Sequence, residues 1–272
     1  MMGAIVGDIV GSRFEHHNIK TKRFRLFHDW CRFTDDTVMT LAVAKAIMKC
    51  NGNVELLSNQ TIECMQEVGR RYPHCGFGRR FKQWVYEDNP LPYNSWGNGS
   101  AMRVSAVAWA ARDLDECIAM SETVTKVTHD HPEGIKGAEA IAVATFMALH
   151  GSTKEEIKTV IEEKYGYDLS FTLDSIRDEY SFDVSCQGSV PPAIVAFLES
   201  NDFVDAIRNA ISIGGDSDTL AACAGAIAEA FYGIPNRVRD FAETYLDPTL
   251  DEILAAFEQA FPPKVAAEDL AE

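Results

Sequence analysis

The sequence FTDDT occupies residues 33–37 and leads directly into the apolar stretch VMTLAVAKAI at residues 38–47. A second stretch, GGDSDT at residues 214–219, also precedes an apolar, alanine-rich run. Capping explains either motif alone, because Thr, Ser and Asp accept hydrogen bonds from the free N–H groups of a first helical turn. Together they indicate more, since carboxylates drawn onto two buried helix ends repel each other unless a cation neutralises them. If the two helix starts meet, we expect an all-oxygen site for two metal ions.

The rest of the chain predicts helices, and no segment shows the alternation typical of a strand. Residues 16–32 and 89–100 are predicted loops, and residues 165–188 have no clear pattern. We therefore predict an all-α fold with a single domain over residues 1–261 and a frayed tail over residues 262–272. The predicted helices cover residues 3–15, the run that begins at 35, and residues 54–71, 79–87, 100–112, 115–127, 135–150, 154–164, 190–200, 202–212, 218–232, 236–245 and 249–261.

Composition narrows the classes of partner. The 25 basic and 41 acidic residues give a formal charge of −16, which disfavours nucleic acid and anionic membranes as general partners because these need Lys and Arg. No apolar run approaches the roughly 18 residues of a membrane-spanning helix, and the first residues lack the features of a signal peptide. The seven cysteines form no Cys-x-x-Cys pair, which predicts reduced thiols and a cytoplasmic protein. We expect a monomer.

Three further features are ambiguous by themselves. The sequence GNGSAMR at residues 97–103 opens a predicted helix and suits either a phosphate or a simple turn. Arg103 can pair with a carboxylate or a phosphate there. The sequence THDH at residues 128–131 is either a ligand-contacting loop or the start of a helix with surface histidines. Glu15 heads the long loop at residues 16–32, as a solvated side chain or as the carboxylate of a mobile gate.

Five blocks in order resemble the ADP-ribosylglycohydrolase family, related to the enzyme that removes ADP-ribose from dinitrogenase reductase. They are GDxxGxxxE at residues 7–15, TDDT at 34–37, GNGSAMR at 97–103, TH at 128–129 and GGDSDTxA at 214–221. The resemblance covers most of the chain. It implies a compact orthogonal helical domain with a binuclear metal centre, and hydrolysis of the bond between the distal ribose C1 of ADP-ribose and an acceptor.

The resemblance also implies residue roles. Two Mg²⁺ or Mn²⁺ ions would be held by Thr34, Asp35, Asp36, Asp216, Asp218 and Thr219. The diphosphate would be received by Gly97, Asn98, Gly99 and Ser100, and His129 would contact the substrate. Glu15 would lie near the metals, and as a hypothesis Glu15 or Asp35 moves protons between water and the leaving group.

Two other functions use the same residues. A binuclear metallohydrolase could cleave the pyrophosphate of ADP-ribose or of a related nucleotide, and a non-catalytic descendant could only bind ADP-ribose. The sequence leaves open which acceptor is released: arginine, serine, another side chain, a base or a small molecule.

Overall fold

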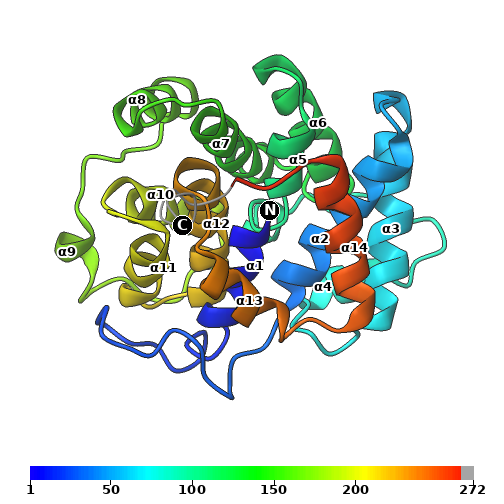
Figure 1. Cartoon of the computed structure of the whole chain (residues 1–272). Helices are drawn as coiled ribbons and strands as arrows, with labels where there is room; N and C mark the ends of the chain where they lie inside the picture. The colour runs from blue at the N-terminus through cyan, green and yellow to red at the C-terminus, as the bar shows by residue number, and fades with distance from the viewer. Residues whose placement is uncertain (265–272) are drawn as a thin grey trace.

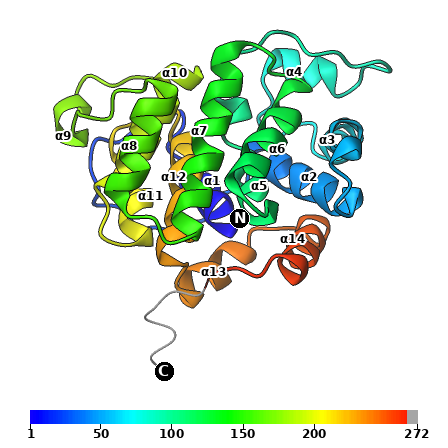
Figure 2. The ribbon, with the colours of Figure 1, turned by 90° about the horizontal axis from the view of Figure 1, so that it is seen from above.

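A computed structural model describes residues 1–264, which form an assembly of helices (Figures 1 and 2). An isolated antiparallel bridge pairs Gly97 with Ser185, and no strand occurs in this part of the chain. The prediction of an all-α fold is confirmed. The helices are α1 (Met2–Gly11), α2 (Asp35–Cys50), η1 (Val54–Leu56), α3 (Leu57–Arg71), α4 (Arg79–Trp84), η2 (Asn98–Ser100), α5 (Ser105–Ala110), α6 (Leu114–Lys126), α7 (Pro132–Leu149), α8 (Lys154–Tyr165), α9 (Leu173–Ile176), α10 (Cys186–Leu198), α11 (Phe203–Ser212), α12 (Ser217–Tyr232), α13 (Asn236–Glu243) and α14 (Pro248–Ala260).

Helices α1 and α12 pack against each other at the centre of the fold (Figure 1). Every residue of α1 is buried, so a helix of small residues is surrounded by neighbours. A Cβ added to Gly3 would lie 2.2 Å from the carbonyl oxygen of Gly225, and one added to Gly7 would lie 2.0 Å from that of Ala221. Only glycine permits this approach, which offsets its weak helix propensity. The close contact places Asp8 of α1 beside the start of α12.

The remaining helices surround this pair. Helices α7, α10 and α11 pack on α12, and α2 packs on α1, α3, α5 and α14. Buried side chains from nearly all of them form one connected hydrophobic core. Among residues 1–264, none of the helices combines the length and the apolar character required to cross a bilayer.

The single domain over residues 1–261 stays a prediction, and most of the predicted tail, residues 265–272, lies outside the described residues. Near its start, Lys264 donates hydrogen bonds to the carbonyl oxygens of Ala230 and Phe231.

Several predicted helices are wrong in extent, and at two of them a serine side chain bonds to a backbone carbonyl oxygen. The first helix ends at Gly11 instead of residue 15, and the Ser12 hydroxyl donates to the carbonyl oxygen of Ile9. The predicted helix at residues 100–112 is a 3-10 turn followed by α5, which begins only at Ser105. In that turn the Ser100 hydroxyl donates to the carbonyl oxygen of Gly134. The Ser12 bond is local and competes with helical hydrogen bonding, whereas the Ser100 bond reaches a residue 34 positions along the chain.

The segment without a clear pattern, residues 165–188, contains the short helix α9 and ends in the first turn of α10. Helix α10 begins at Cys186, four residues earlier than predicted, because the Ser185 side chain caps it by accepting a hydrogen bond from the N–H of Gly188. Between α9 and α10 the chain passes close to the start of α12, where Tyr180 lies against Gly215.

Candidate metal centre and substrate cavity

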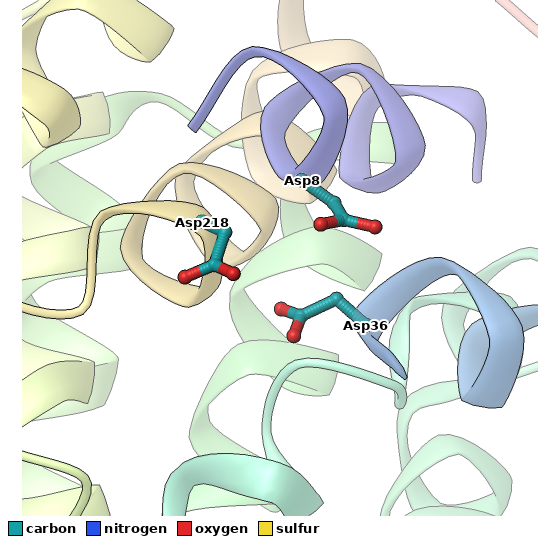
Figure 3. A group of neighbouring side chains, drawn as sticks. All are labelled: Asp8, Asp36 and Asp218. Atoms are coloured by element: carbon teal, nitrogen blue, oxygen red, sulfur yellow. The ribbon is translucent and has the colours of Figure 1, made fainter. Parts of the chain in front are cut away.

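Three buried carboxylates from three helices point toward one another (Figure 3). They belong to Asp8 of α1, Asp36 of α2 and Asp218 of α12, and one oxygen of each lies within 4.8 Å of the others. A second group of the same kind joins Glu15, Asp216 and Asp218. The two groups share Asp218, so the structure brings together the two helix starts that the sequence singled out.

The start of α2 is organised by Asp8. One oxygen of its carboxylate accepts hydrogen bonds from the backbone N–H groups of Thr34 and Thr37, at 2.8 and 3.0 Å, and from the Thr37 hydroxyl. The other accepts from the Thr34 hydroxyl at 2.7 Å. Thr34 is also the N-cap of α2 and accepts from the N–H of Asp36 at 3.3 Å. Asp8 therefore satisfies donors that would otherwise be buried without a partner.

The start of α12 is held from outside the helix. Gly214 and Gly215 precede it with φ angles of 72° and 74°, which other residues rarely adopt. Asp216 accepts a hydrogen bond of 2.7 Å from the side-chain amide of Asn98. The Thr219 hydroxyl donates to Asp36 at 3.4 Å. Asn98 therefore links the glycine-rich turn at residues 97–100 to the carboxylates.

The electrostatics of the cluster are unfavourable without a cation. Burial, with the neighbouring Asp8 carboxylate, raises the pKa of Asp35 to about 7, and burial raises the pKa of Asp8 to about 6. The pKa values of Asp36 and Asp218 rise well above their usual range, first through burial and then through the other carboxylates. Buried like charges of this kind are ordinarily neutralised by protons or metal ions.

The donor set fits a hard divalent cation. The ligand atoms are all oxygens, and Oδ1 of Asp36 is buried with no hydrogen-bond partner among the described residues. Carboxylate, hydroxyl and water oxygens are the ligands that Mg²⁺ and Mn²⁺ prefer. The carboxylates that could hold such ions are Asp8, Asp36 and Asp218 in one group and Glu15, Asp216 and Asp218 in the other. The Thr219 hydroxyl lies beside Asp36.

A cavity of about 450 Å³ opens above this cluster, a size typical of small-molecule sites. Most of the residues predicted for the site line it: Glu15, Asp35, Asp36, Gly97, Asn98, Gly99, His129, Asp216, Asp218 and Thr219. Two do not. Thr34 lies behind the carboxylates, bonded to Asp8, and the fully buried Ser100 bonds to the carbonyl oxygens of Gly97 and Gly134.

Comparison with known proteins decides which family this arrangement represents. The model of one family, ADP-ribosylglycohydrolase, matches residues 1–264. The chain belongs to the ADP-ribosylglycohydrolase family. This membership confirms the fold type, the enzyme class and the coarse activity that the resemblance implied, the hydrolytic removal of ADP-ribose.

Individual family members agree with this assignment. The chain is 26% identical to ADP-ribosylhydrolase ARH3 of Mus musculus, with 86% of this chain and 83% of that protein covered. It is 26% identical to ADP-ribosylarginine hydrolase Tri1 of Pseudomonas putida (strain GB-1), with 89% and 72% covered. A solved structure, an ADP-ribosylglycohydrolase-related protein complex, shares the fold with a TM-score of 0.65 and 22% identity over 94% of this chain and 95% of that one.

The sequence analysis did not predict that Asp8 belongs to the carboxylate cluster, although the motif GDxxGxxxE contains this residue. The signal was a lone carboxylate in a helix that is otherwise apolar. It also missed cavity-lining side chains on other segments, namely Arg79, Arg80, Phe81, Tyr93, Phe182 and Val184. These carry no motif, and only the fold shows that they meet.

The glycine-rich turn faces the cavity with much of its backbone already bonded. The N–H of Gly97 donates to the Ser95 hydroxyl at 3.1 Å, and that of Asn98 donates to the carbonyl oxygen of Val184 at 2.7 Å. Arg103 follows the turn, lines the cavity and is 1% exposed. Burial lowers the pKa of Arg103 to about 10, so it stays cationic at neutral pH. An anionic group beside Arg103 would meet positive charge, whereas the part of the lining formed by Asp36, Asp216 and Asp218 is acidic.

Proposed function

We propose that this protein is a divalent-metal-dependent hydrolase that cleaves the bond between the distal ribose C1 of ADP-ribose and an acceptor. The observation that carries the proposal is one cavity whose wall contains both the converging carboxylates and Gly97, Gly99, His129 and Arg103. A molecule that carries both a ribose diol and a diphosphate matches these two kinds of lining.

We assign the metal ligands to Thr34, Asp35, Asp36, Asp216, Asp218 and Thr219, with Mg²⁺ or Mn²⁺ as the ions. The bound ions would supply charge neutralisation, Lewis acidity and orientation of the ribose hydroxyls and of water. Asp36, Asp218 and Thr219 fit this set best, because they line the cavity and lie beside one another. Thr34 fits this set least well, because it does not line the cavity and its hydroxyl donates to Asp8.

The chain itself would bind, orient and move protons. Gly97, Asn98, Gly99 and His129 line the wall where the diphosphate would lie, and Ser100 would hold the turn in shape through its buried hydroxyl. Glu15 and Asp35 also line the cavity, and burial raises the pKa of both carboxyl groups. From this position either carboxylate could take a proton from water and either carboxyl could give one to the leaving group. The oxocarbenium-like transition state would develop beside these carboxylates.

The test is hydrolysis of an ADP-ribosylated arginine peptide and an ADP-ribosylated serine peptide, with products read by mass spectrometry. Metal-stripped protein should be inactive, and Mg²⁺ or Mn²⁺ should restore release of intact ADP-ribose. Asp218→Asn should reduce turnover at least roughly a hundredfold, whereas Asp251→Asn, an exposed position in the first turn of α14, should not. Release of AMP instead of ADP-ribose would contradict the proposal and establish cleavage of the pyrophosphate.

The same experiment also tests the acceptor, because faster hydrolysis of one of the two peptides would identify the linkage that the protein prefers. Location in the cell and oligomeric state stay predictions.

A further inference from the structure

His129 lies between two different surroundings. Its Nδ1 atom is 2.7 Å from the Thr128 hydroxyl oxygen. Its Nε2 atom faces the glycine turn, since an added Cβ on Gly97 or Gly99 would lie 3.6 or 3.5 Å from it. The side chain lines the cavity, although the residue is only 5% exposed. The Nε2 edge is therefore the one that a ligand in the cavity meets.

Thr128 determines what Nδ1 can do. The residue is fully buried, and its hydroxyl oxygen accepts a hydrogen bond of 2.7 Å from Nη2 of Arg103. A guanidinium can only donate, so the single hydroxyl proton of Thr128 remains available for another acceptor. Within the described residues, the recorded neighbour that can take it is Nδ1 of His129. An unprotonated Nδ1 satisfies both groups, whereas a protonated Nδ1 would leave the buried hydroxyl proton without an acceptor.

We propose that Arg103 and Thr128 are positioning residues that fix His129 as the neutral tautomer with its proton on Nε2, directed at the glycine turn. This tautomer presents a hydrogen-bond donor to the cavity. The other neutral tautomer would present a lone pair, which repels an anionic oxygen. The ligand chemistry is a phosphate or diphosphate oxygen, and only this assignment rests on the proposed function.

The surrounding contacts keep the unit in place. The N–H groups of Thr128 and His129 both donate to the carbonyl oxygen of Thr125, at 3.2 and 2.9 Å, and the carbonyl oxygen of Thr128 accepts from the N–H of Tyr93 at 3.1 Å. The charged or titratable groups facing the imidazole are the guanidinium of Arg103 and the phenol of Tyr93, whose ring centroid is 5.8 Å away. Burial, together with the charge of Arg103, holds the pKa of His129 well below its usual range. The imidazole therefore stays uncharged near neutral pH.

The experiment reads the tautomer directly. In protein labelled with ¹⁵N-histidine, long-range ¹H–¹⁵N correlation spectra distinguish protonated from unprotonated ring nitrogens, and His129→Gln assigns the signals. We expect Nε2 protonated and Nδ1 unprotonated in the wild type from pH 6 to 8. Thr128→Val should shift the signals toward protonated Nδ1, and Thr128→Ser should restore them. A wild-type spectrum with protonated Nδ1, or an unchanged Thr128→Val spectrum, would overturn the proposal.

Thr125→Val is the matched control. Thr125 is a fully buried threonine in the preceding helix, and its hydroxyl has no recorded partner among the described residues. This variant removes the same hydroxyl group and should keep the wild-type spectrum. If Thr128→Val fails to fold, the wild-type and Thr128→Ser spectra still decide the tautomer.

Calorimetric titration with ADP-ribose separates this inference from the proposed function. Thr128→Val should weaken binding roughly tenfold, the size of one hydrogen bond to a charged group, while Thr125→Val and Thr128→Ser should bind as the wild type does. Equal affinity in Thr128→Val would overturn the positioning role in binding. Absence of ADP-ribose binding in the wild type, with the expected tautomer present, would contradict the proposed function and leave the tautomer assignment standing.

Discussion

The starts of α2 and α12 carry the same kinds of side chain but are held in different ways. At α2 a carboxylate from another helix, Asp8, accepts hydrogen bonds from N–H and hydroxyl groups of Thr34 and Thr37. At α12 the N-cap residue Asp216 makes no capping bond through its side chain and instead accepts one from Asn98. Asp8 therefore anchors the start of α2 through four hydrogen bonds, whereas Asp216 does not cap α12 and is itself held by Asn98.

The supports of α12 also come from loops. The side-chain amide of Asn18 donates to the carbonyl oxygens of Gly215 and Glu15, at 2.8 and 3.1 Å, and its oxygen accepts from the N–H of Gly215 at 2.8 Å. Lys20 donates to the carbonyl oxygens of Tyr180 and Ile213, both at 2.6 Å. The segment that carries Glu15 is thus fastened to the turn before Asp216. The start of α2 is therefore held by a buried carboxylate, while the turn before α12 is held by the side chains of loop residues.

We expect the largest effect from a substitution that removes the Asp8 carboxylate at the start of α2. Asp8→Ala leaves two backbone N–H groups and two hydroxyls without their acceptor in a buried place, so it should cost about 3 kcal/mol or more of unfolding free energy. Asp218→Ala should be neutral or stabilising in metal-free protein, because it removes a carboxylate whose pKa is raised first by burial and then by the other carboxylates. Urea unfolding of both variants in EDTA measures the difference. Equal losses would show that the two helix starts are held alike.

A smaller effect follows from the raised pKa values. Asp8 and Asp35 have pKa values of about 6 and 7 in the folded protein, above the usual value of roughly 3.9 expected for an unfolded chain. From about pH 4 to 7 the folded protein therefore holds more protons than the unfolded chain, and its stability falls as pH rises. Metal-free protein should melt about 5 °C lower at pH 8 than at pH 5.

Thermal unfolding in EDTA and in Mn²⁺ checks this dependence. Bound cations should remove most of the loss at pH 8, because they stabilise the ionised carboxylates. Asp218→Asn should reduce the pH dependence in EDTA. A melting temperature that rises from pH 5 to pH 8 in EDTA would contradict the electrostatic account of the cluster.

The helical spacing of apolar residues predicted most helices well, because each helix must bury one face and this requirement is visible in the local sequence. The predicted helix at residues 202–212 is α11, Phe203–Ser212, and the one at 236–245 is α13, Asn236–Glu243. Ends were wrong where a side chain competes with the backbone, as Ser12 and Ser100 do. For Ser100 the acceptor is the carbonyl oxygen of Gly134, which is distant in the sequence, so sequence spacing does not predict this bond.

The candidate site was predictable in so far as it is built from helix starts. TDDT and GDSDT mark carboxylates at helix ends, and the structure brings these together. The role of Asp8 depends on how α1 packs against α2, and the positions of Phe182 and Val184 depend on a segment without periodicity. The roles assigned to individual residues at the site remain predictions for the experiments above.

The smallest expected effect tests the loop support of α12. Asn18→Ala removes the bonds that join Glu15 to Gly215 and should lower the turnover rate about tenfold through misplacement of Glu15. Stability should change by only about 1 kcal/mol, since the affected hydrogen bonds lie near the surface. Asn53→Ala is the matched control, because Asn53 caps η1 with a bond to the N–H of Glu55 and does not line the cavity. Steady-state kinetics and hydrogen exchange over residues 12–20 separate the cases. Faster exchange with unchanged kinetics would mean that the bonds of Asn18 do not set the position of Glu15 during the reaction.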